Sequence, residues 1–427
     1  MPNLNQLLEH GPARTASGLA ALYKPGQLPE QQARYRALLK TFAARFPGQT
    51  TVEIFSAPGR TEVGGNHTDH NGGRVLAAAV DLDILAVAAP TAAGGLTLCS
   101  EGYPLIQIDL DGLAPVAAER GTSAALVRGV GARLKALGYR VGSFAACVTS
   151  NVLKGSGLSS SAAYEVLIAT IINHLYNAGQ IDPLVCAQAG QFAENEYFGK
   201  PCGLMDQAAS ALGGFVMIDF EDLARPAARK VDFDFTASGY SLVIVDTGGS
   251  HVDLTEDYAA VPREMQQVAH RLGGQRLCDV PAERMLEQLA ALRPQVGDRA
   301  LLRALHFYAD DRRVVEQVAA LERNDFQRFL ELVIESGYSS WTLAQNCYSS
   351  HNVAEQGLSL ALALSEKALK GHGAWRVHGG GFAGTIQAFV PNGQLASYVA
   401  QMHRVFGPSA CYELMIRLSG ATKVEVG

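Results

Sequence analysis

The feature that most restricts the fold is a glycine- and serine-rich segment between a predicted strand and a predicted helix. It reads KGSGLSSSAA over residues 154–163, after the strand-like SFAACVTSN and before the apolar helical AAYEVLIATIINHLY. Small residues let the backbone approach a ligand closely, and the following helix offers unpaired N–H groups at its first turn. The segment predicts an anion-binding loop, and it is not a Walker loop because no Gly-Lys-Ser/Thr follows at the required spacing. A serine-rich helix cap without a ligand is the alternative that this segment alone leaves open.

Strand-like and helical segments alternate through the rest of the chain. Helical spacing covers most of residues 1–45, and short strands separated by glycine turns follow from residue 51. The alternation resumes after residue 215 with FVMIDF and YSLVIVDT, a long helical region over 255–345, and the strand-like WRVHGGGFAGTIQAFV and ACYELMIRL. The pattern predicts an α/β (α+β) architecture of two domains, residues 1–215 and residues 216–427.

The charge balance and the cysteines exclude several classes of protein. The 35 basic and 41 acidic residues give a net charge of −6, without the basic excess of a nucleic-acid-binding protein. None of the seven cysteines forms a CxxC pair, which favours free thiols in a reducing compartment. The first residues lack the pattern of a signal peptide, and the longest apolar runs, such as VLIATII at 166–172, are too short to span a membrane. We therefore expect a cytoplasmic protein with no nucleic-acid or membrane partner.

A second polar segment, APGRTEVGGNHTDHNGG, covers residues 57–73. Its arginine, histidines, aspartate and asparagines lie between glycine turns, an arrangement that suits a small polyhydroxylated ligand, in which each hydroxyl needs a partner. His67, Asp69 and His70 are the possible metal ligands, but no further ligand cluster with zinc spacing accompanies them. A solvated turn is the other alternative.

Two further segments carry candidate groups. The segment HGGGFAG at 378–384 matches GxGxxG, but the strand-like TIQAFV follows it and no acidic residue lies about 20 positions on, so a dinucleotide-binding loop is rejected. We expect this glycine loop to support another ligand loop. In GLMDQ at 203–207, Asp206 begins an alanine-rich helical stretch, where it is either a helix cap or a functional carboxylate.

Together, four blocks in this order resemble the galactokinases of the GHMP small-molecule kinase superfamily. The blocks are PGRTEVGGNHTDHNGG (58–73), KGSGLSSSAA (154–163), CGLMDQ (202–207) and HGGGFAG (378–384). The resemblance implies the two-domain GHMP kinase fold with the active site in the cleft between the domains. It also implies ATP-dependent phosphorylation of the anomeric hydroxyl of galactose, giving galactose 1-phosphate and ADP, with Mg²⁺ and in a monomer.

The resemblance also implies roles for individual residues. Those that match the nucleotide-binding loop are Gly155, Gly157, Leu158, Ser159, Ser160, Ser161 and Ala162. Ser161 and Glu165 are the expected Mg²⁺ ligands, since Mg²⁺ takes hard oxygen donors. Asp206 is the expected catalytic carboxylate and Arg60 its partner. The expected sugar contacts are Asn66, His67, Asp69, Gly203 and Tyr258.

The two catalytic residues are expected to share the chemistry of phosphoryl transfer, which needs mainly positioning and charge neutralisation. Asp206 could accept the proton of the sugar hydroxyl. A nearby arginine favours the ionised carboxylate and so weakens it as a base. Arg60 could instead stabilise charge on the transferring phosphate while Asp206 orients the nucleophile, and we expect both residues to contribute.

Two positions depart from the family pattern. Asn66 stands where most galactokinases have a glutamate that is expected to accept a hydrogen bond from the C6 hydroxyl. Asparagine lacks the charge, which weakens such a bond by about 1 kcal/mol and admits a C6 carboxylate, as in galacturonate. After Tyr258 the chain reads AAVPRE instead of paired arginines, which weakens the assignment of Tyr258.

Three functions follow from these residues. Galactokinase is the leading interpretation, and a kinase for a C6-altered galactose such as galacturonate is the alternative within the same class. A sugar sensor without turnover is the alternative from another class. The presence of Ser161, Ala162, Asp206 and Arg60 argues against the sensor, which would be free to lose them.

Overall fold

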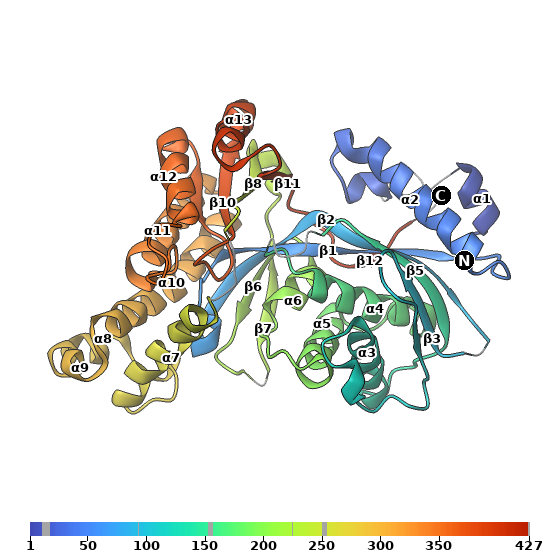
Figure 1. Ribbon diagram of the computed structural model, residues 1–427, viewed down its shortest axis with the longest axis horizontal. Helices are drawn as coiled ribbons and strands as arrows, with labels where there is room; N and C mark the ends of the chain where they lie inside the picture. The colour runs from blue at the N-terminus through green and yellow to red at the C-terminus, as the bar shows by residue number, and fades with distance from the viewer. Residues whose placement is uncertain (11–17, 93, 153–156, 224, 250–253, 426–427) are drawn as a thin grey trace.

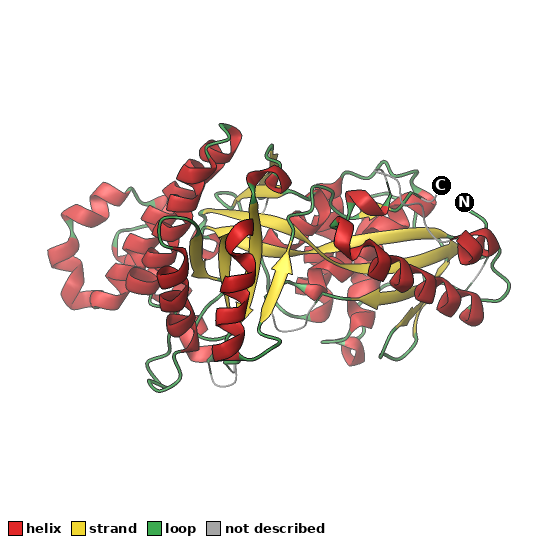
Figure 2. Cartoon of the chain, turned by 90° about the horizontal axis from the view of Figure 1, so that it is seen from above, coloured by secondary structure: helices red, strands yellow, loops and turns green. Residues whose placement is uncertain are grey.

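The computed structural model describes residues 1–10, 18–92, 94–152, 157–223, 225–249 and 254–425, which form two sheets with helices packed on them (Figure 1). The larger sheet has the strand order β12-β1-β2-β5-β3-β4, and β6 and β7 extend it from one end of β2. Its strands are β1 (Glu53–Gly64), β2 (Arg74–Pro90), β3 (Leu96–Ser100), β4 (Ile106–Ile108), β5 (Phe144–Ser150), β6 (Phe215–Asp219), β7 (Ala227–Val231) and β12 (Thr422–Lys423). Seen from above, the strands of this sheet run along the long axis of the molecule (Figure 2).

The long antiparallel pair of β1 and β2 forms the centre of the larger sheet. Nearly every residue of both strands is buried, and β2 accordingly consists mostly of small and apolar side chains, whereas the second half of β1 carries buried polar ones. Their register shifts between Pro58 and Arg60 and again between Glu62 and Gly64. Such bulges re-aim the side chains of a strand, and here they occur within the polar segment that follows Ala57.

Helices cover both faces of the larger sheet (Figure 1). One face carries α3 (Ser123–Ala136), α4 (Ser160–Tyr176), α5 (Pro183–Phe192) and α6 (Met205–Leu212). The other carries α1 (Leu4–His10) and α2 (Leu28–Arg45). Helices α4 and α6 pack directly on β1 and β2, so the first turn of each lies next to the polar segment of β1.

The second sheet has the order β11-β8-β10-β9 and lies among the remaining helices (Figure 1). Its strands are β8 (Tyr240–Asp246), β9 (Ala374–Val377), β10 (Thr385–Pro391) and β11 (Cys411–Leu414). The helices are α7 (Thr255–Arg271), α8 (Ala282–Glu287), α9 (Leu289–Val296), α10 (Asp298–Glu322), α11 (Phe326–Ser339), α12 (Gly357–Leu369) and α13 (Leu395–Phe406). None of the described helices is long and apolar enough to cross a lipid bilayer.

The predicted α/β class with two units is confirmed, and the sheets show where the chain passes from one to the other. Strand β6 begins at Phe215 and pairs with β2, and β7 pairs with β6, so both strands belong to the larger sheet. The passage to the second sheet therefore lies between Val231 and Tyr240, after the predicted boundary at residue 215, and β12 later returns to pair with β1. The division into domains at residue 215 stays a prediction.

One buried carboxylate ties the two ends of the chain to the larger sheet. Asp83 is fully buried, and its Oδ1 accepts a hydrogen bond of 2.6 Å from Arg34. Its Oδ2 accepts from the Tyr23 hydroxyl at 2.5 Å, from Ser56, and from the Arg417 guanidinium at 3.4 Å. Two arginines and two hydroxyls compensate the desolvation of this charge, which makes Asp83 a structural anchor.

Candidate active site

Arg60 and Asp206 form an ion pair between β1 and the first turn of α6. The Asp206 Oδ1 lies 2.7 Å from the Arg60 Nε and 2.6 Å from its Nη2. The Asp206 side chain is 27% exposed and the Arg60 side chain 10%, so the pair is partly desolvated. The second Asp206 oxygen, Oδ2, accepts a hydrogen bond from the Ser159 hydroxyl. The structure thus brings together three predicted residues from three separate motifs.

The predicted phosphate loop lies directly against the Arg60 segment. The Arg60 backbone N–H donates to the Leu158 carbonyl at 3.1 Å, and its guanidinium donates to the Gly157 carbonyl. A Cβ on Gly59 would lie 2.8 Å from the Leu158 carbonyl oxygen, so only glycine permits this approach. Ser159 adopts a left-handed conformation with φ of 57° just before α4. Gly155 lies outside the described residues.

A hollow of about 560 Å³ opens beside Ser160 and Ser161. Its other walls combine apolar and aromatic side chains with a few polar groups, among them Tyr103, Leu126, Asn151, Val152 and Phe198. A mostly apolar slot with a few polar groups is typical of a small-molecule site. Sequence reasoning did not find these residues, because they come from scattered segments that share no motif.

A cluster of buried acidic and polar side chains lies behind Ser161. The Ser161 hydroxyl donates to the Glu194 Oε1 at 3.3 Å, and the Lys200 ammonium lies 3.3 Å from the same oxygen. The Gln207 amide donates to the Glu194 Oε2 at 3.0 Å and to the Glu165 Oε2 at 2.9 Å. Glu194 lies in the π-helical turn Ala193–Phe198, and sequence reasoning missed it.

The two carboxylates of this cluster differ in their suitability for a cation. Burial, together with the charge on Glu194, raises the pKa of Glu165 well above its ordinary value. The Glu165 Oε1 is buried without a hydrogen-bond partner among the described atoms, whereas Glu194 contacts both Ser161 and Lys200. The geometry favours Glu194 as the carboxylate beside Ser161, and the assignment of Glu165 to Mg²⁺ stays a prediction.

Ser161 and Glu194 fit a Mg²⁺ ion whose remaining ligands are phosphate and water oxygens. No group of three or more His, Cys, Asp or Glu side chains in the described part of the chain is arranged to hold a metal. Mg²⁺ is commonly bound through one or two carboxylates, with phosphates and waters as its remaining ligands. The hydroxyl of Ser161 and the carboxylate of Glu194 would suit such a partial site.

Asp69 and Gly203, which were predicted to bind a sugar, lie next to one another. A Cβ on Gly203 would lie 3.5 Å from the Asp69 Oδ2, and both residues line a hollow of about 370 Å³. His70 lines it as well, with its Nε2 3.5 Å from the Asp69 Oδ1. Polar groups on Gln191 and Asn195 complete one wall. This arrangement of donors and acceptors suits a polyhydroxylated ligand.

The glycine loop at 378–384 contacts the predicted sugar-binding segment, residues 57–73. The Gly380 carbonyl lies 2.9 Å from the His67 Nε2, and the Gly381 carbonyl accepts a 2.7 Å hydrogen bond from the Tyr258 hydroxyl. The His378 ring contacts Thr61 at 3.0 Å, close to Gly157. Strand β10 follows this loop, and these contacts agree with the expected supporting role, whereas ligand binding by the supported segments stays a prediction.

Burial changes the titration of the rings around the glycine loop. Burial and the neighbouring His70 ring lower the pKa of His67 to about 4, and burial raises the pKa of Tyr258 to about 12. Both groups are therefore neutral at physiological pH. His67 also has a left-handed backbone, with φ of 59°.

The Asn66 side chain is buried and turned into the protein. Its amide donates to the Glu62 Oε1 at 2.9 Å and to the Gly379 carbonyl at 2.8 Å. Its oxygen accepts from the Ser340 hydroxyl at 3.1 Å and from the Asn346 amide at 2.8 Å. The predicted sugar contact through Asn66 stays a prediction, and the geometry disfavours it.

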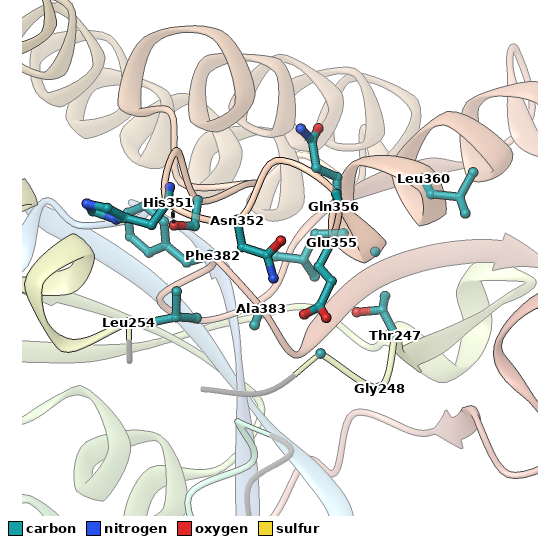
Figure 3. A pocket seen from close by; sticks show the side chains of 15 residues that line it. Thr247, Gly248, Leu254, His351, Asn352, Glu355, Gln356, Leu360, Phe382 and Ala383 are labelled. Atoms are coloured by element: carbon teal, nitrogen blue, oxygen red, sulfur yellow. Dashed lines mark hydrogen bonds between the residues drawn. The ribbon is translucent and has the colours of Figure 1, made fainter. Parts of the chain in front are cut away.

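A larger hollow, of about 1040 Å³, is lined by Phe382 and Ala383 of the glycine loop (Figure 3). Thr247, Leu254 and the loop before α12 supply its other walls. Its described lining includes none of the residues predicted for the site.

Comparison with known families agrees with this geometry. The family model described as the galactokinase galactose-binding signature matches residues 40–90, and the model of the GHMP kinase N-terminal domain matches residues 124–214. The chain thus resembles the GHMP kinases, and the galactokinases among them. The two matches cover the segments that contain Arg60, Asp69, Ser161 and Asp206, and they confirm the resemblance to galactokinases.

Solved structures share the fold of this chain over most of its length. Lactococcus lactis galactokinase complexed with galactose is 26% identical, with a TM-score of 0.74, and the match covers 91% of this chain and 99% of that one. Methanococcus jannaschii mevalonate kinase matches with a TM-score of 0.61 at 14% identity, covering 86% of this chain and 98% of that one. Streptococcus pneumoniae phosphomevalonate kinase matches with a TM-score of 0.56 at 13% identity, covering 87% and 99%. The latter two support the fold alone.

Proposed function

We propose that this chain is a GHMP kinase and specifically a galactokinase, which transfers the γ-phosphoryl group of ATP to the anomeric hydroxyl of galactose. The observation that carries the proposal is the convergence of Arg60, Asp206 and Ser159 beside the phosphate loop. Gly203, three residues before Asp206 in the sequence, lines the same hollow as Asp69. The Lactococcus lactis galactokinase with galactose supports the choice of sugar. The products are galactose 1-phosphate and ADP.

The contacts of Asp206 suit the task of holding the sugar hydroxyl. Arg60 engages the Oδ1 through two N–H groups and keeps the carboxylate in one orientation. The Oδ2, which accepts from Ser159, is then the oxygen that receives the proton of the anomeric hydroxyl as the phosphoryl group transfers. Asp69 and Gly203 hold the ring hydroxyls, so that the nucleophile is placed before the chemical step.

The nucleotide binds along the other side of the same loop. The hollow beside Ser160 and Ser161 takes the adenosine, and the N–H groups at the start of α4 face the phosphates. When bound, Mg²⁺ neutralises charge on the phosphates. Ser161 and Glu194 would hold it, and Lys200 lies beside Glu194 as a further cation.

A galacturonate kinase is not favoured. That alternative depended on an uncharged Asn66 facing the C6 substituent. All four hydrogen-bonding positions of the Asn66 amide are occupied by protein groups instead.

The first test is a measurement of ADP release with Mg²⁺-ATP and either galactose or galacturonate. We expect turnover with galactose and its loss in Asp206→Ala. Turnover should persist in Asp111→Ala, which removes an exposed aspartate outside the residues assigned to the site. Turnover of galacturonate alone would overturn the choice of sugar. Tight galactose binding without ADP release would overturn the kinase and favour a sensor.

A further inference from the structure

The hydrogen bonds of Asn66 account for its whole side chain. A carboxamide has two N–H donors and two acceptor positions on its oxygen. The donors are used by Glu62 and Gly379, and the acceptor positions by Ser340 and Asn346, at distances of 2.8 to 3.1 Å. The residue is 1% exposed. The side chain therefore has no position free for a ligand.

The backbone of Asn66 is fastened as well. Its N–H donates to the Asp310 Oδ2 at 2.8 Å, and its carbonyl accepts from the His306 Nε2 at 2.7 Å, both on α10. Through these bonds one residue of the β1 segment is attached to α10, to the segment that follows α11 and to the glycine loop. His67, with its left-handed backbone, is the next residue along the chain.

We propose that Asn66 is a positioning residue, which fixes the turn carrying His67 and Asp69 and does not touch the sugar. This inference rests on the proposed sugar kinase function for the meaning of that turn. It assigns to Asn66 the anchoring of the sugar-binding segment to the second half of the molecule. It follows that residue 66 does not read the C6 substituent.

The chemistry of the neighbours explains why an amide is required here. The Glu62 Oε1 that accepts from Asn66 also accepts from the Arg376 Nη2 at 2.9 Å. A carboxylate at position 66 would face Glu62 with no hydrogen between them and would also repel the Gly379 carbonyl. Burial already raises the pKa of Glu62, with Arg376 and Asn66 opposing that rise. An added buried negative charge would therefore be strongly destabilising.

The relation between the two side chains can be tested by exchanging their functions. Asn66→Asp places a carboxylate at position 66, and Glu62→Gln supplies an amide that donates to it while its oxygen still accepts from Arg376. We expect Asn66→Asp to lower the thermal unfolding midpoint by at least about 3 °C and the double variant to recover most of that loss. If Asn66→Asp does not give soluble protein, recovery of soluble protein in the double variant is the same result.

Asn71 offers a matched control in the same motif. Its amide contacts the Met265 sulfur and the Leu277 N–H, and neither contact involves Glu62. Glu62→Gln should therefore leave the defect of Asn71→Asp uncorrected. Equal rescue of Asn71→Asp, or no rescue of Asn66→Asp, would overturn the proposed contact.

A sugar comparison distinguishes positioning from direct contact. With Asn66→Ala, kcat/KM for galactose and for 6-deoxygalactose should fall by the same factor, within about twofold. The KM for both sugars should rise in Asn66→Ala while the KM for ATP stays unchanged. The double variant Asn66→Asp with Glu62→Gln should bring the sugar KM back toward that of the unaltered protein. A loss about tenfold larger for galactose than for 6-deoxygalactose would make Asn66 a contact to the C6 hydroxyl and overturn the proposal.

The two inferences can fail separately. If the unaltered protein phosphorylates neither sugar, the proposed function fails. The thermal unfolding midpoints of the unaltered protein, Asn66→Asp, Glu62→Gln and the double variant still test the anchoring role. Recovery in the double variant would then support that role without any activity.

Discussion

Replacing Asp206 by asparagine changes the charge of the site while keeping its shape. The two contacts from Arg60 end on one oxygen, so the amide oxygen of an asparagine can take the place of Oδ1. The amide NH₂ then stands where Oδ2 was, facing Ser159, whose hydroxyl can turn to accept from it. The variant therefore keeps the arrangement but presents a donor where the sugar hydroxyl needs a proton acceptor.

The size of the effect follows from these contacts. A positioned general base contributes about 10²- to 10⁴-fold. Phosphoryl transfer depends mainly on positioning and charge neutralisation, so we expect Asp206→Asn to lower kcat by about 10²- to 10³-fold, or about 2.7–4.1 kcal/mol. The pair is partly exposed, so its loss costs about 1–2 kcal/mol of stability. Over 427 residues this corresponds to a midpoint shift of only about 1–2 °C.

The assay is ADP release at saturating galactose and Mg²⁺-ATP, with galactose binding measured by calorimetry on the same preparations. We expect binding to persist in Asp206→Asn while turnover is lost. Ser159→Ala is the graded comparison, since it removes one hydrogen bond to Oδ2, and we expect it to lower kcat by only about tenfold or less. Turnover by Asp206→Asn within tenfold of the unaltered protein would refute the reasoning.

Three other predictions follow from the described contacts. Glu194→Gln should raise the Mg²⁺ concentration for half-maximal activity by about tenfold or more, whereas Glu165→Gln should change it little. A larger rise in Glu165→Gln than in Glu194→Gln would contradict the choice of Glu194 as the Mg²⁺ carboxylate. Burial and nearby arginines lower the pKa of His378 to about 3. As pH falls below about 6.5, this histidine takes up a proton only in the unfolded chain, so it lowers the free energy of unfolding by about 1.4 kcal/mol per pH unit down to about pH 3. In His378→Gln, the free energy of unfolding measured with denaturant should therefore fall less steeply between pH 7 and pH 5. Asp83→Ala should cost about 3–5 kcal/mol because it leaves buried arginines unpaired, and a loss below about 1 kcal/mol in urea unfolding would contradict the anchoring role.

Local sequence pattern predicted the elements but not which sheet each strand joins. The alternation around residue 215 marks β6 as a strand, yet its partner is β2, more than a hundred residues earlier. Strand pairing of this kind depends on long-range contacts that periodicity does not report. The return of β12 to β1 was missed for the same reason.

The candidate site was predicted where its residues belong to motifs. Arg60, Ser159 and Asp206 meet in the structure. Each could be found from the sequence because it lies in a block with glycine turns or a helix start. Glu194 stands alone in a π-helical turn and carries no such pattern. The environment of Asn66 was equally hidden, since three of its four side-chain partners lie about 270 to 310 residues further along the chain.

The contacts of Asp83 have a consequence for folding during synthesis on the ribosome. Arg417 follows Asp83 by 334 residues, so at about 5–20 residues per second the carboxylate is translated roughly 20–60 s before its second arginine. During that interval the nascent larger sheet also lacks the edge strand that β12 will provide. Until those residues emerge, the nascent chain exposes the unpaired edge of β1 and an incompletely neutralised carboxylate, so the larger sheet is most open to mispairing in that interval.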